Sequence, residues 1–382
     1  MSVLATVYAA PLLFFFLTTM AITALVTPVA MRVALRVGLI DRPAPHKFHQ
    51  RTTPYLGGAA VGLSVLIALV VTMVLIPERR VLAATVAVAS LAVAGIGLLD
   101  DWLTIGTLPR LAVQAAAALS LWAAGTRVSA TGTALIDLPL MVLVVLAVTN
   151  AVNLLDNMDG ISAGTVAIAS VFFFLAAYSN GQRLVPILAV ALAGACLGFL
   201  PFNFSPARIF LGDAGTLFMG FMVATVALRL ELPGYPAITR FAVPALILLV
   251  PIFDMTLVVL SRWRAGRPVF RGGTDHSSPR LVALGASPRL AALVTYAAAT
   301  LSGTAALFLL QARGAGVTWA VLVAATVLAV SVLWRLEKVP AVTPAQLERA
   351  YAEWPKGARS ARTPVVVSSR FVASSGTLPP GH

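Results

Sequence analysis

Acidic residues are scarce in this chain, so their positions are informative. Only 14 of the 382 residues are Asp or Glu. Asp100 and Asp101 directly follow the apolar run 95–99, where a hydrocarbon-like segment ends. Adjacent carboxylates repel each other unless a cation or a shared proton offsets the repulsion, and a divalent metal is their natural partner. The pair predicts metal binding or acid–base chemistry, with a solvated helix end as the simpler alternative.

A second polar cluster lies in segment 150–160, which reads NAVNLLDNMDG. At 100° per residue, positions 150, 153 and 157 share one helix face, and Asp156 lies beside that face. Asp159 follows three residues later. A polar stripe of this kind suits the binding of a polar ligand. A buried hydrogen-bond network between helices is the alternative.

A third segment, 201–215, joins a loop rich in Pro and Asn to an acid between glycines. Asn203 lies near its start, and Asp213 lies between Gly212 and the pair Ala214-Gly215. Glycines allow a phosphate or a metal to approach the backbone closely. Taken alone, this segment is only a moderate indication of such a site.

Two loops carry positive groups suited to phosphates. The first, 41–58, holds Lys47 and His49, and the second, 262–280, holds His276 and Arg280. Part of this charge must serve topology and attraction to lipid headgroups. Carboxylates for Mg²⁺ combined with cations for phosphate oxygens are typical of phosphoryl transfer at a membrane surface.

The elements that must position these residues are membrane-spanning helices. Hydrophobic residues make up 59% of the chain and charged residues 11%, whereas a soluble domain carries about 25% charged residues. We therefore expect an all-α, polytopic bundle of about eleven transmembrane helices, each needing about 20 apolar residues. The expected spans are 8–31, 56–76, 81–99, 110–124, 135–152, 162–179, 184–201, 214–230, 240–261, 288–311 and 316–334.

The charges of the loops predict the orientation of the bundle. Most of the 27 Lys and Arg residues fall in the loops that also hold the acidic motifs. The positive-inside rule then places the N-terminus outside and the C-terminus in the cytoplasm. Segment 1–339 is expected to form the transmembrane domain, and 340–382 a largely disordered cytoplasmic tail with a short helix at 344–354. The net charge of +13 reflects scarce carboxylates, and no nucleic-acid partner is expected.

In this order, the segments resemble the motifs of the polyprenyl-phosphate N-acetylhexosamine-1-phosphate transferases (the MraY/WecA/TagO superfamily). The resemblance runs from about 39 to 290 and is stronger to the WecA/TagO-like branch than to the peptidoglycan branch. The matching stretches are DRPAPHKFHQRTTPYLGG, GLLDDW, NAVNLLDNMDGISAG, FNFSPARIFLGDAG and RPVFRGGTDHSSPRLVALG. One such motif is a weak signal, but five in order on one predicted face are a strong one.

The resemblance implies a Mg²⁺-dependent reaction in which Mn²⁺ can substitute. A polyprenyl (undecaprenyl or decaprenyl) phosphate attacks the β-phosphorus of a UDP-N-acetylhexosamine, giving polyprenyl-diphospho-sugar and UMP. GlcNAc is the favoured sugar, and the reaction is the first lipid-linked step of a cell-envelope polysaccharide at the cytoplasmic face of the cell membrane.

The resemblance also implies roles for individual residues. Asp213 is the expected metal ligand, and Asp100 and Asp101 are the expected catalytic residues, with Asp101 also assisting the metal. The expected nucleotide and substrate contacts are Asn153, Asp156, Asp159, Asn203, Lys47, His49, His276 and Arg280.

Two departures from the family pattern leave alternatives open. Asn157 replaces a glycine of the third motif, and the histidine loop retains only His276, followed by Ser277, Ser278 and Pro279. The alternatives are a phospho-MurNAc-pentapeptide transferase, a non-catalytic family member and a secondary transporter. The oligomeric state, including a homodimer, is left open.

Overall fold

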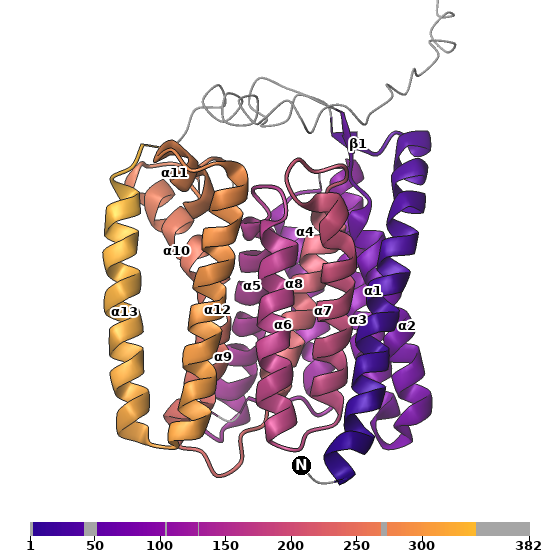
Figure 1. Cartoon of the computed structure of the whole chain (residues 1–382), viewed down its shortest axis with the longest axis vertical. Coiled ribbons are helices and arrows are strands. Elements are labelled where there is room, and N and C mark those ends of the chain that lie inside the picture. The colour runs from indigo at the N-terminus through magenta and orange to yellow at the C-terminus, as the bar shows by residue number, and fades with distance from the viewer. Residues whose placement is uncertain (1–2, 42–51, 104, 129, 269–272, 341–382) are drawn as a thin grey trace, which may run out of the picture.

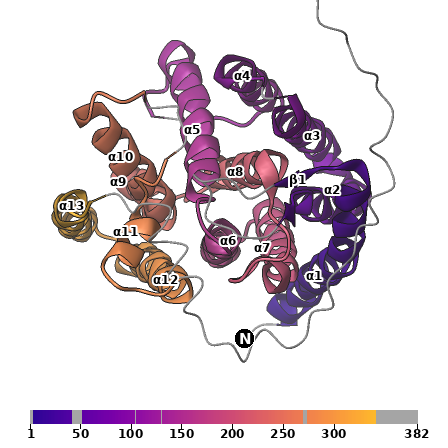
Figure 2. The ribbon, with the colours of Figure 1, turned by 90° about the horizontal axis from the view of Figure 1, so that it is seen from above.

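The computed structural model describes residues 3–41, 52–103, 105–128, 130–268 and 273–340, and this part of the chain is almost entirely helical (Figure 1). The first helices pack in chain order around one side of the bundle (Figure 2). The helices are α1 Val3–Val37, α2 Gly57–Leu75, η1 Pro77–Arg79, α3 Arg80–Leu103, α4 Thr107–Ala123, α5 Ala134–Leu155, α6 Ile161–Ser179, α7 Leu184–Asn203, α8 Gly212–Arg229, α9 Ala237–Ile247, α10 Leu249–Arg264, α11 Ser277–Ala283, α12 Pro288–Ala312 and α13 Ala315–Glu337.

The predicted polytopic helical architecture is confirmed. Within the described residues, eight helices are long and apolar enough to cross a membrane, and a ninth crossing is possible if one bent pair counts as one span. Helices α4, with 17 residues, and α8, with 18, are the shorter members of the bundle at predicted spans. The count of eleven crossings therefore stays a prediction.

The predicted span 240–261 is two helices rather than one. Helices α9 and α10 meet at an angle of 73°. Leu248 separates them, and Pro251 lies in the first turn of α10. Proline has no amide hydrogen and its ring clashes with the preceding turn, so a straight helix cannot pass through it unchanged. Pro251 indicates this break in the sequence, but it lies within a continuous apolar run that we interpreted as one span.

Close packing around α8 brings three helices together at the acidic motifs. Helix α8 lies in the interior of the bundle (Figure 2), and its residues from Ala214 to Ala227 are buried. A Cβ atom added to Gly58 of α2 would lie 2.2 Å from the Cα of Gly215. One added to Gly97 of α3 would lie 2.5 Å from the Asp213 carbonyl oxygen. Small residues allow helix backbones to approach closely in a membrane bundle.

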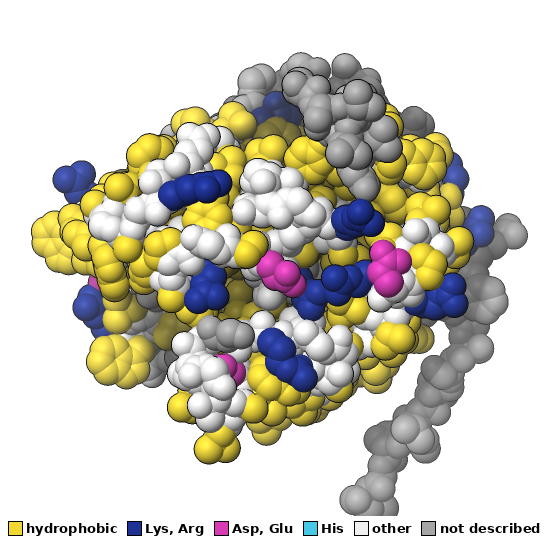
Figure 3. Space-filling view, turned by 90° about the horizontal axis from the view of Figure 1, so that it is seen from below, with side chains coloured by type: hydrophobic (Ala, Val, Ile, Leu, Met, Phe, Trp, Pro, Cys, Tyr) yellow, Lys and Arg dark blue, Asp and Glu magenta, His cyan; other side chains and the backbone are white. Residues whose placement is uncertain are grey.

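The described chain begins and ends at opposite ends of the bundle. The N-terminus lies at the end opposite β1 (Ile40–Asp41) and α11, whereas α13 ends at the β1 end (Figure 1). This arrangement agrees with an odd number of crossings. Figure 3 shows the end opposite β1, where basic and acidic side chains are scattered over a largely apolar surface. Which end faces the cytoplasm stays a prediction.

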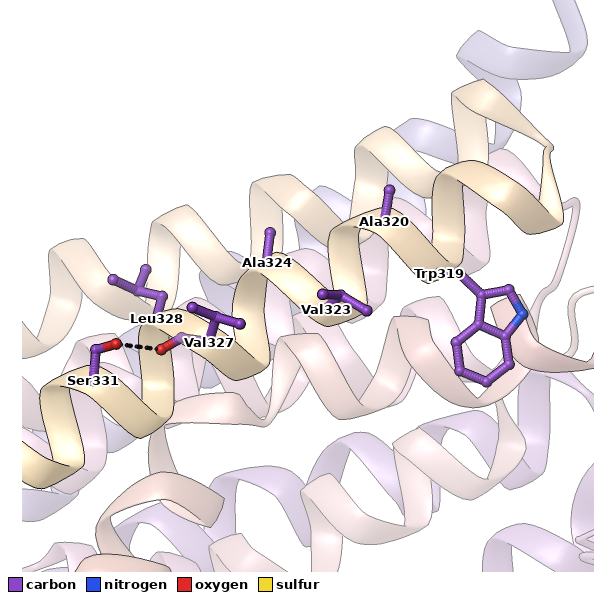
Figure 4. A pocket seen from close by; sticks show the side chains of 7 residues that line it. All are labelled: Trp319, Ala320, Val323, Ala324, Val327, Leu328 and Ser331. Atoms are coloured by element: carbon purple, nitrogen blue, oxygen red, sulfur yellow. Dashed lines mark hydrogen bonds between the residues drawn. The ribbon is translucent and has the colours of Figure 1, made fainter.

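Two further features concern the C-terminal third. The loop expected at 262–287 contains the short helix α11. Helix α13 is the least buried of the long helices, and a shallow apolar groove runs along its outer face from Trp319 to Ser331 (Figure 4). The boundary at 339/340 and the helix expected at 344–354 lie at or beyond the end of the described residues.

Candidate active site

Asp101 lies in the last turn of α3 and contacts the backbone at the start of α8. Its two carboxylate oxygens accept hydrogen bonds from the amides of Asp213 (2.9 Å) and Ala214 (3.2 Å). A carboxylate at a helix N-terminus satisfies free amide groups and is attracted by the helix dipole. Gly212 leaves room for this contact, because a Cβ atom there would lie 2.6 Å from the carboxylate. Asp101 therefore positions Asp213, and its expected roles in metal binding and catalysis stay predictions.

Asp213 lies in the first turn of α8, and its two oxygens meet side chains from two other helices. The Asn153 amide of α5 donates to one oxygen at 2.9 Å and also lies 2.7 Å from the Thr216 hydroxyl. Arg110 of α4 donates to the other oxygen at 2.6 Å. The structure thus brings together Asp213 and Asn153, which the sequence placed in the site.

Arg110 links Asp213 to Asp100. The same guanidinium nitrogen, Nη1, lies 2.9 Å from Asp100 Oδ2 and 2.6 Å from Asp213 Oδ2. The other Asp100 oxygen accepts a hydrogen bond from the Gly106 amide at 3.2 Å. Sequence reasoning counted Arg110 only as a loop charge and missed this contact. The available signal was its isolation, because no other Lys or Arg lies between positions 81 and 126.

Asp156 and Asp159 complete the acidic part of the site. Burial, together with the nearby charges of Asp213, Asp159 and Asp101, raises the pKa of Asp156 to about 7. Asp159 accepts a hydrogen bond from the Ala207 amide at 2.9 Å. These carboxylates therefore lie close enough to interact electrostatically, and their combined charge attracts cations.

The donor set of this site fits a magnesium ion held with the help of a substrate. Among the described residues, no three His, Cys, Asp or Glu side chains are grouped as an all-protein metal site requires. Asp100 and Asp213 nevertheless provide two carboxylates that already share a cationic group, that of Arg110. Mg²⁺ is usually bound by one or two carboxylates together with waters and substrate phosphates.

Asn203 has a structural position beside the site. Its side-chain oxygen accepts from the Gly160 amide at 3.0 Å, and its Nδ2 donates to the Ile209 carbonyl at 3.0 Å. The residue is buried. Asn203 thus joins the turn that carries Asp156 and Asp159 to the loop before α8, and its expected contact with a nucleotide stays a prediction.

The histidine loop is braced by α10. His276 Nδ1 lies 2.8 Å from Asp254 Oδ2, and the amide of Ser277 donates to the other Asp254 oxygen at 2.7 Å. Ser278 hydrogen-bonds to Asn157 and connects the loop to the third motif. The histidine loop is therefore connected through Ser278 to the motif that holds Asp156, and the expected phosphate contact of His276 stays a prediction.

Arg280 is engaged by the protein itself. Its guanidinium donates to the carbonyl oxygens of Asp275 (3.1 Å) and Leu336 and to the Ser261 hydroxyl (2.7 Å). Burial raises the pKa of Asp275, but the bound Arg267 and Arg262 lower it more strongly. In the structure, Arg280 of α11 connects this helix to the end of α13. Its expected phosphate contact stays a prediction.

The described part of the first basic loop adjoins α8. The amide of Phe210 donates to the Pro54 carbonyl at 2.9 Å, and the amide of Gly58 donates to the Leu211 carbonyl at 3.0 Å. The Tyr55 hydroxyl approaches the Asp101 carbonyl at 3.5 Å. Strands β1 and β2 (Thr53–Pro54) pair at the base of this loop. The predicted phosphate contacts Lys47 and His49 lie outside the described residues.

A membrane helical bundle with an acidic, arginine-bridged site at one end defines a polytopic membrane enzyme. Residues 82–231 match the family model described as glycosyl transferase family 4. A probable undecaprenyl-phosphate N-acetylglucosaminyl 1-phosphate transferase of Bacillus subtilis is 32% identical over 292 residues, which cover 74% of this chain and 80% of that protein.

Two further relatives show how far the similarity extends. A decaprenyl-phosphate N-acetylglucosaminephosphotransferase of Mycobacterium tuberculosis is 32% identical over 314 residues, 73% of this chain and 78% of that protein. A phospho-N-acetylmuramoyl-pentapeptide-transferase of Clostridium botulinum is 37% identical over 139 residues, 36% of this chain and 41% of that protein. The chain belongs to the polyprenyl-phosphate N-acetylhexosamine-1-phosphate transferase family, and it is a multi-pass membrane transferase.

Proposed function

We propose that the protein transfers GlcNAc-1-phosphate from UDP-GlcNAc to a polyprenyl phosphate in a Mg²⁺-dependent reaction. The products are polyprenyl-diphospho-GlcNAc and UMP, and the product begins the assembly of a cell-envelope polysaccharide. The observation that carries this proposal is the Asp100–Arg110–Asp213 bridge at the end of a membrane bundle. It supplies two carboxylates and a cation where a lipid phosphate at the membrane surface can meet a nucleotide.

The long similarities favour GlcNAc over a muramoyl-pentapeptide. The two relatives whose names specify N-acetylglucosamine align with 73–74% of the chain, whereas the pentapeptide transferase aligns with 36%. The loops of the site end are also those that carry most of the Lys and Arg residues. That charge asymmetry supports a cytoplasmic active site in the cell membrane, where UDP-sugars are made.

The residues of the site suit an in-line displacement. Asp100, at the end of α3, is the candidate for accepting a proton from the lipid phosphate or for orienting it. An oxygen of that phosphate forms the new bond to the β-phosphorus, and the bond between this phosphorus and the bridging oxygen of UMP breaks. Asp156 and Asp159 lie close enough to interact electrostatically and are the candidates for orienting the nucleotide.

Asp213 and Asp100 are the residues that would hold the metal. Bound Mg²⁺ neutralises the charge that develops on the diphosphate and on the leaving UMP. Asp101 keeps Asp213 in place through the amides at the start of α8, and Asn153 holds its second oxygen. The protein thus contributes positioning and electrostatic stabilisation, which are the main sources of catalysis in phosphoryl transfer.

The test uses purified protein in lipid vesicles that contain polyprenyl phosphate. The donors are UDP-GlcNAc, UDP-GalNAc and UDP-MurNAc-pentapeptide, with lipid-linked product as the readout. We expect activity with UDP-GlcNAc and a loss of about 10²-fold or more in Asp213→Asn, because a charge that stabilises the transition state is removed. Glu231→Gln is the matched control, since Glu231 is exposed and lies outside the site. Equal activity of Asp213→Asn and the parent would refute the assignment.

A further inference from the structure

The Arg110 guanidinium sits in an incompletely satisfied environment. Its Nη1 is shared between two carboxylates, at 2.6 Å from Asp213 and 2.9 Å from Asp100. Its Nε is buried and has no hydrogen-bond partner among the described residues. A buried donor without a partner carries a desolvation penalty. The carboxylates therefore hold Arg110 through Nη1, while its buried Nε has no partner among the described residues.

Arg110 and a divalent cation compete for the space between the same two carboxylate oxygens. Mg²⁺ binds oxygen at about 2.0–2.1 Å and requires near-octahedral geometry. A guanidinium nitrogen within 3 Å of both Oδ2 atoms occupies the space that such an ion needs, and the two positive charges repel each other. A metal ion that bridges these two oxygens therefore competes with the observed Arg110 contacts.

We propose that Arg110 is an internal counter-ion that a divalent cation must displace from the Asp100–Asp213 pair. This inference rests on the proposed metal site. Without Arg110, two carboxylates from α3 and α8 would face each other with no positive charge between them, which is unfavourable. With it, half of the negative charge of the metal-free pair is offset, and the metal affinity is lowered by the energy needed to release the arginine.

The position of Arg110 allows its side chain to leave the two carboxylates. Arg110 lies in the first turn of α4, and its side chain remains 18% exposed. A long side chain at a helix start can turn outward without moving the helix. The Asn153 contact to the other Asp213 oxygen does not involve Arg110, so Asp213 would keep its orientation after the exchange.

The test measures binding of Mn²⁺ alone, by electron paramagnetic resonance, to the full-length protein in detergent. We expect Arg110→Gln to bind Mn²⁺ about tenfold or more tightly than the parent, because the competing charge is gone. Arg110→Lys, which keeps a charge but not the planar guanidinium, should lie between them. In the absence of metal, Arg110→Gln should unfold at a lower temperature than the parent, and Mn²⁺ should raise its unfolding temperature more than it raises the parent's.

The outcomes separate this inference from the proposed function. If Asp213→Asn abolishes Mn²⁺ binding but Arg110→Gln binds with the parent's affinity or more weakly, the metal site stands and the counter-ion role of Arg110 is refuted. If neither the parent nor Arg110→Gln binds Mn²⁺ saturably, both the metal site and the counter-ion role are refuted. Should Arg110→Gln not fold, a lower Mn²⁺ affinity in Arg110→Lys than in the parent would also overturn the inference.

Discussion

Replacing Arg280 by Ala separates a structural from a phosphate-binding role for this residue. In the structure its guanidinium joins Asp275 and Ser261 to the carbonyl oxygens of Leu336 and Val339 at the end of α13. The side chain is only 3% exposed, so water cannot replace these bonds. Breaking a buried charged network costs roughly 3–5 kcal/mol. At about 2 °C per kcal/mol for a large chain, Arg280→Ala should lower the unfolding temperature by on the order of 8 °C.

The matched control is Arg264→Ala. Arg264 also contacts the end of α13, through Glu337, but its side chain is 55% exposed. An exposed ion pair contributes about 1 kcal/mol or less, so this variant should shift the unfolding temperature by only about 2 °C. Both arginines contact the end of α13, so the two variants differ mainly in how deeply the removed arginine was buried.

The assay combines thermal unfolding in detergent with thiol accessibility. A cysteine at the buried position Leu336 should be protected in the parent background and should react in the Arg280→Ala background. The native Cys196 is fully buried and gives a low background. An unchanged unfolding temperature together with a KM for the UDP-sugar raised about tenfold would refute the structural role and support the phosphate contact.

Three further outcomes follow from the site and its helices. Asp101→Asn replaces one acceptor oxygen by a donor that faces an α8 amide, which should lower the free energy of unfolding by about 1–3 kcal/mol. Transfer assays should show reduced activity with an unchanged molar ratio of lipid-linked product to UMP. Gly97→Ala places a methyl group against the Asp213 carbonyl and should lower stability by about 1–3 kcal/mol, whereas Gly95→Ala, in open space, should be neutral. Cysteines at positions 50, 105 and 272 should react with impermeant reagents only from the cytoplasmic side, and labelling of position 272 in intact cells would overturn the orientation.

The sequence was sufficient to predict the helical membrane architecture and to single out acidic residues that lie near one another in the structure. Long apolar runs report burial in lipid directly, because almost every residue of a span must be apolar. Asp100, Asp156 and Asp213 were identifiable for the converse reason, since carboxylates at the edge of such runs are costly. The broken span α9–α10 was missed because Pro251 lies inside a run that is apolar on both sides.

The different contacts that Asp100 and Asp101 make could not be predicted from the sequence. Asp100 and Asp101 are neighbours in the chain, yet one contacts Arg110 and the other caps α8. Which way each side chain points depends on the crossing of α3 and α8, and that crossing is set by contacts such as Gly97 against Asp213. Arg280 was likewise interpreted as a phosphate ligand, because a basic residue in an arginine-rich loop carries no sign of the distant carbonyl groups that it meets.

The most direct test of the central claim identifies the nucleotide released during transfer. Purified protein in vesicles with polyprenyl phosphate is supplied with Mg²⁺ and UDP-GlcNAc labelled in both the uracil and the sugar. Transfer of a sugar phosphate predicts UMP and lipid-linked GlcNAc in equal amounts, with both lost in Asp213→Asn. Release of UDP instead, with the sugar attached to lipid without its phosphate, would contradict attack at the β-phosphorus and with it the assignment of this site to phosphoryl transfer.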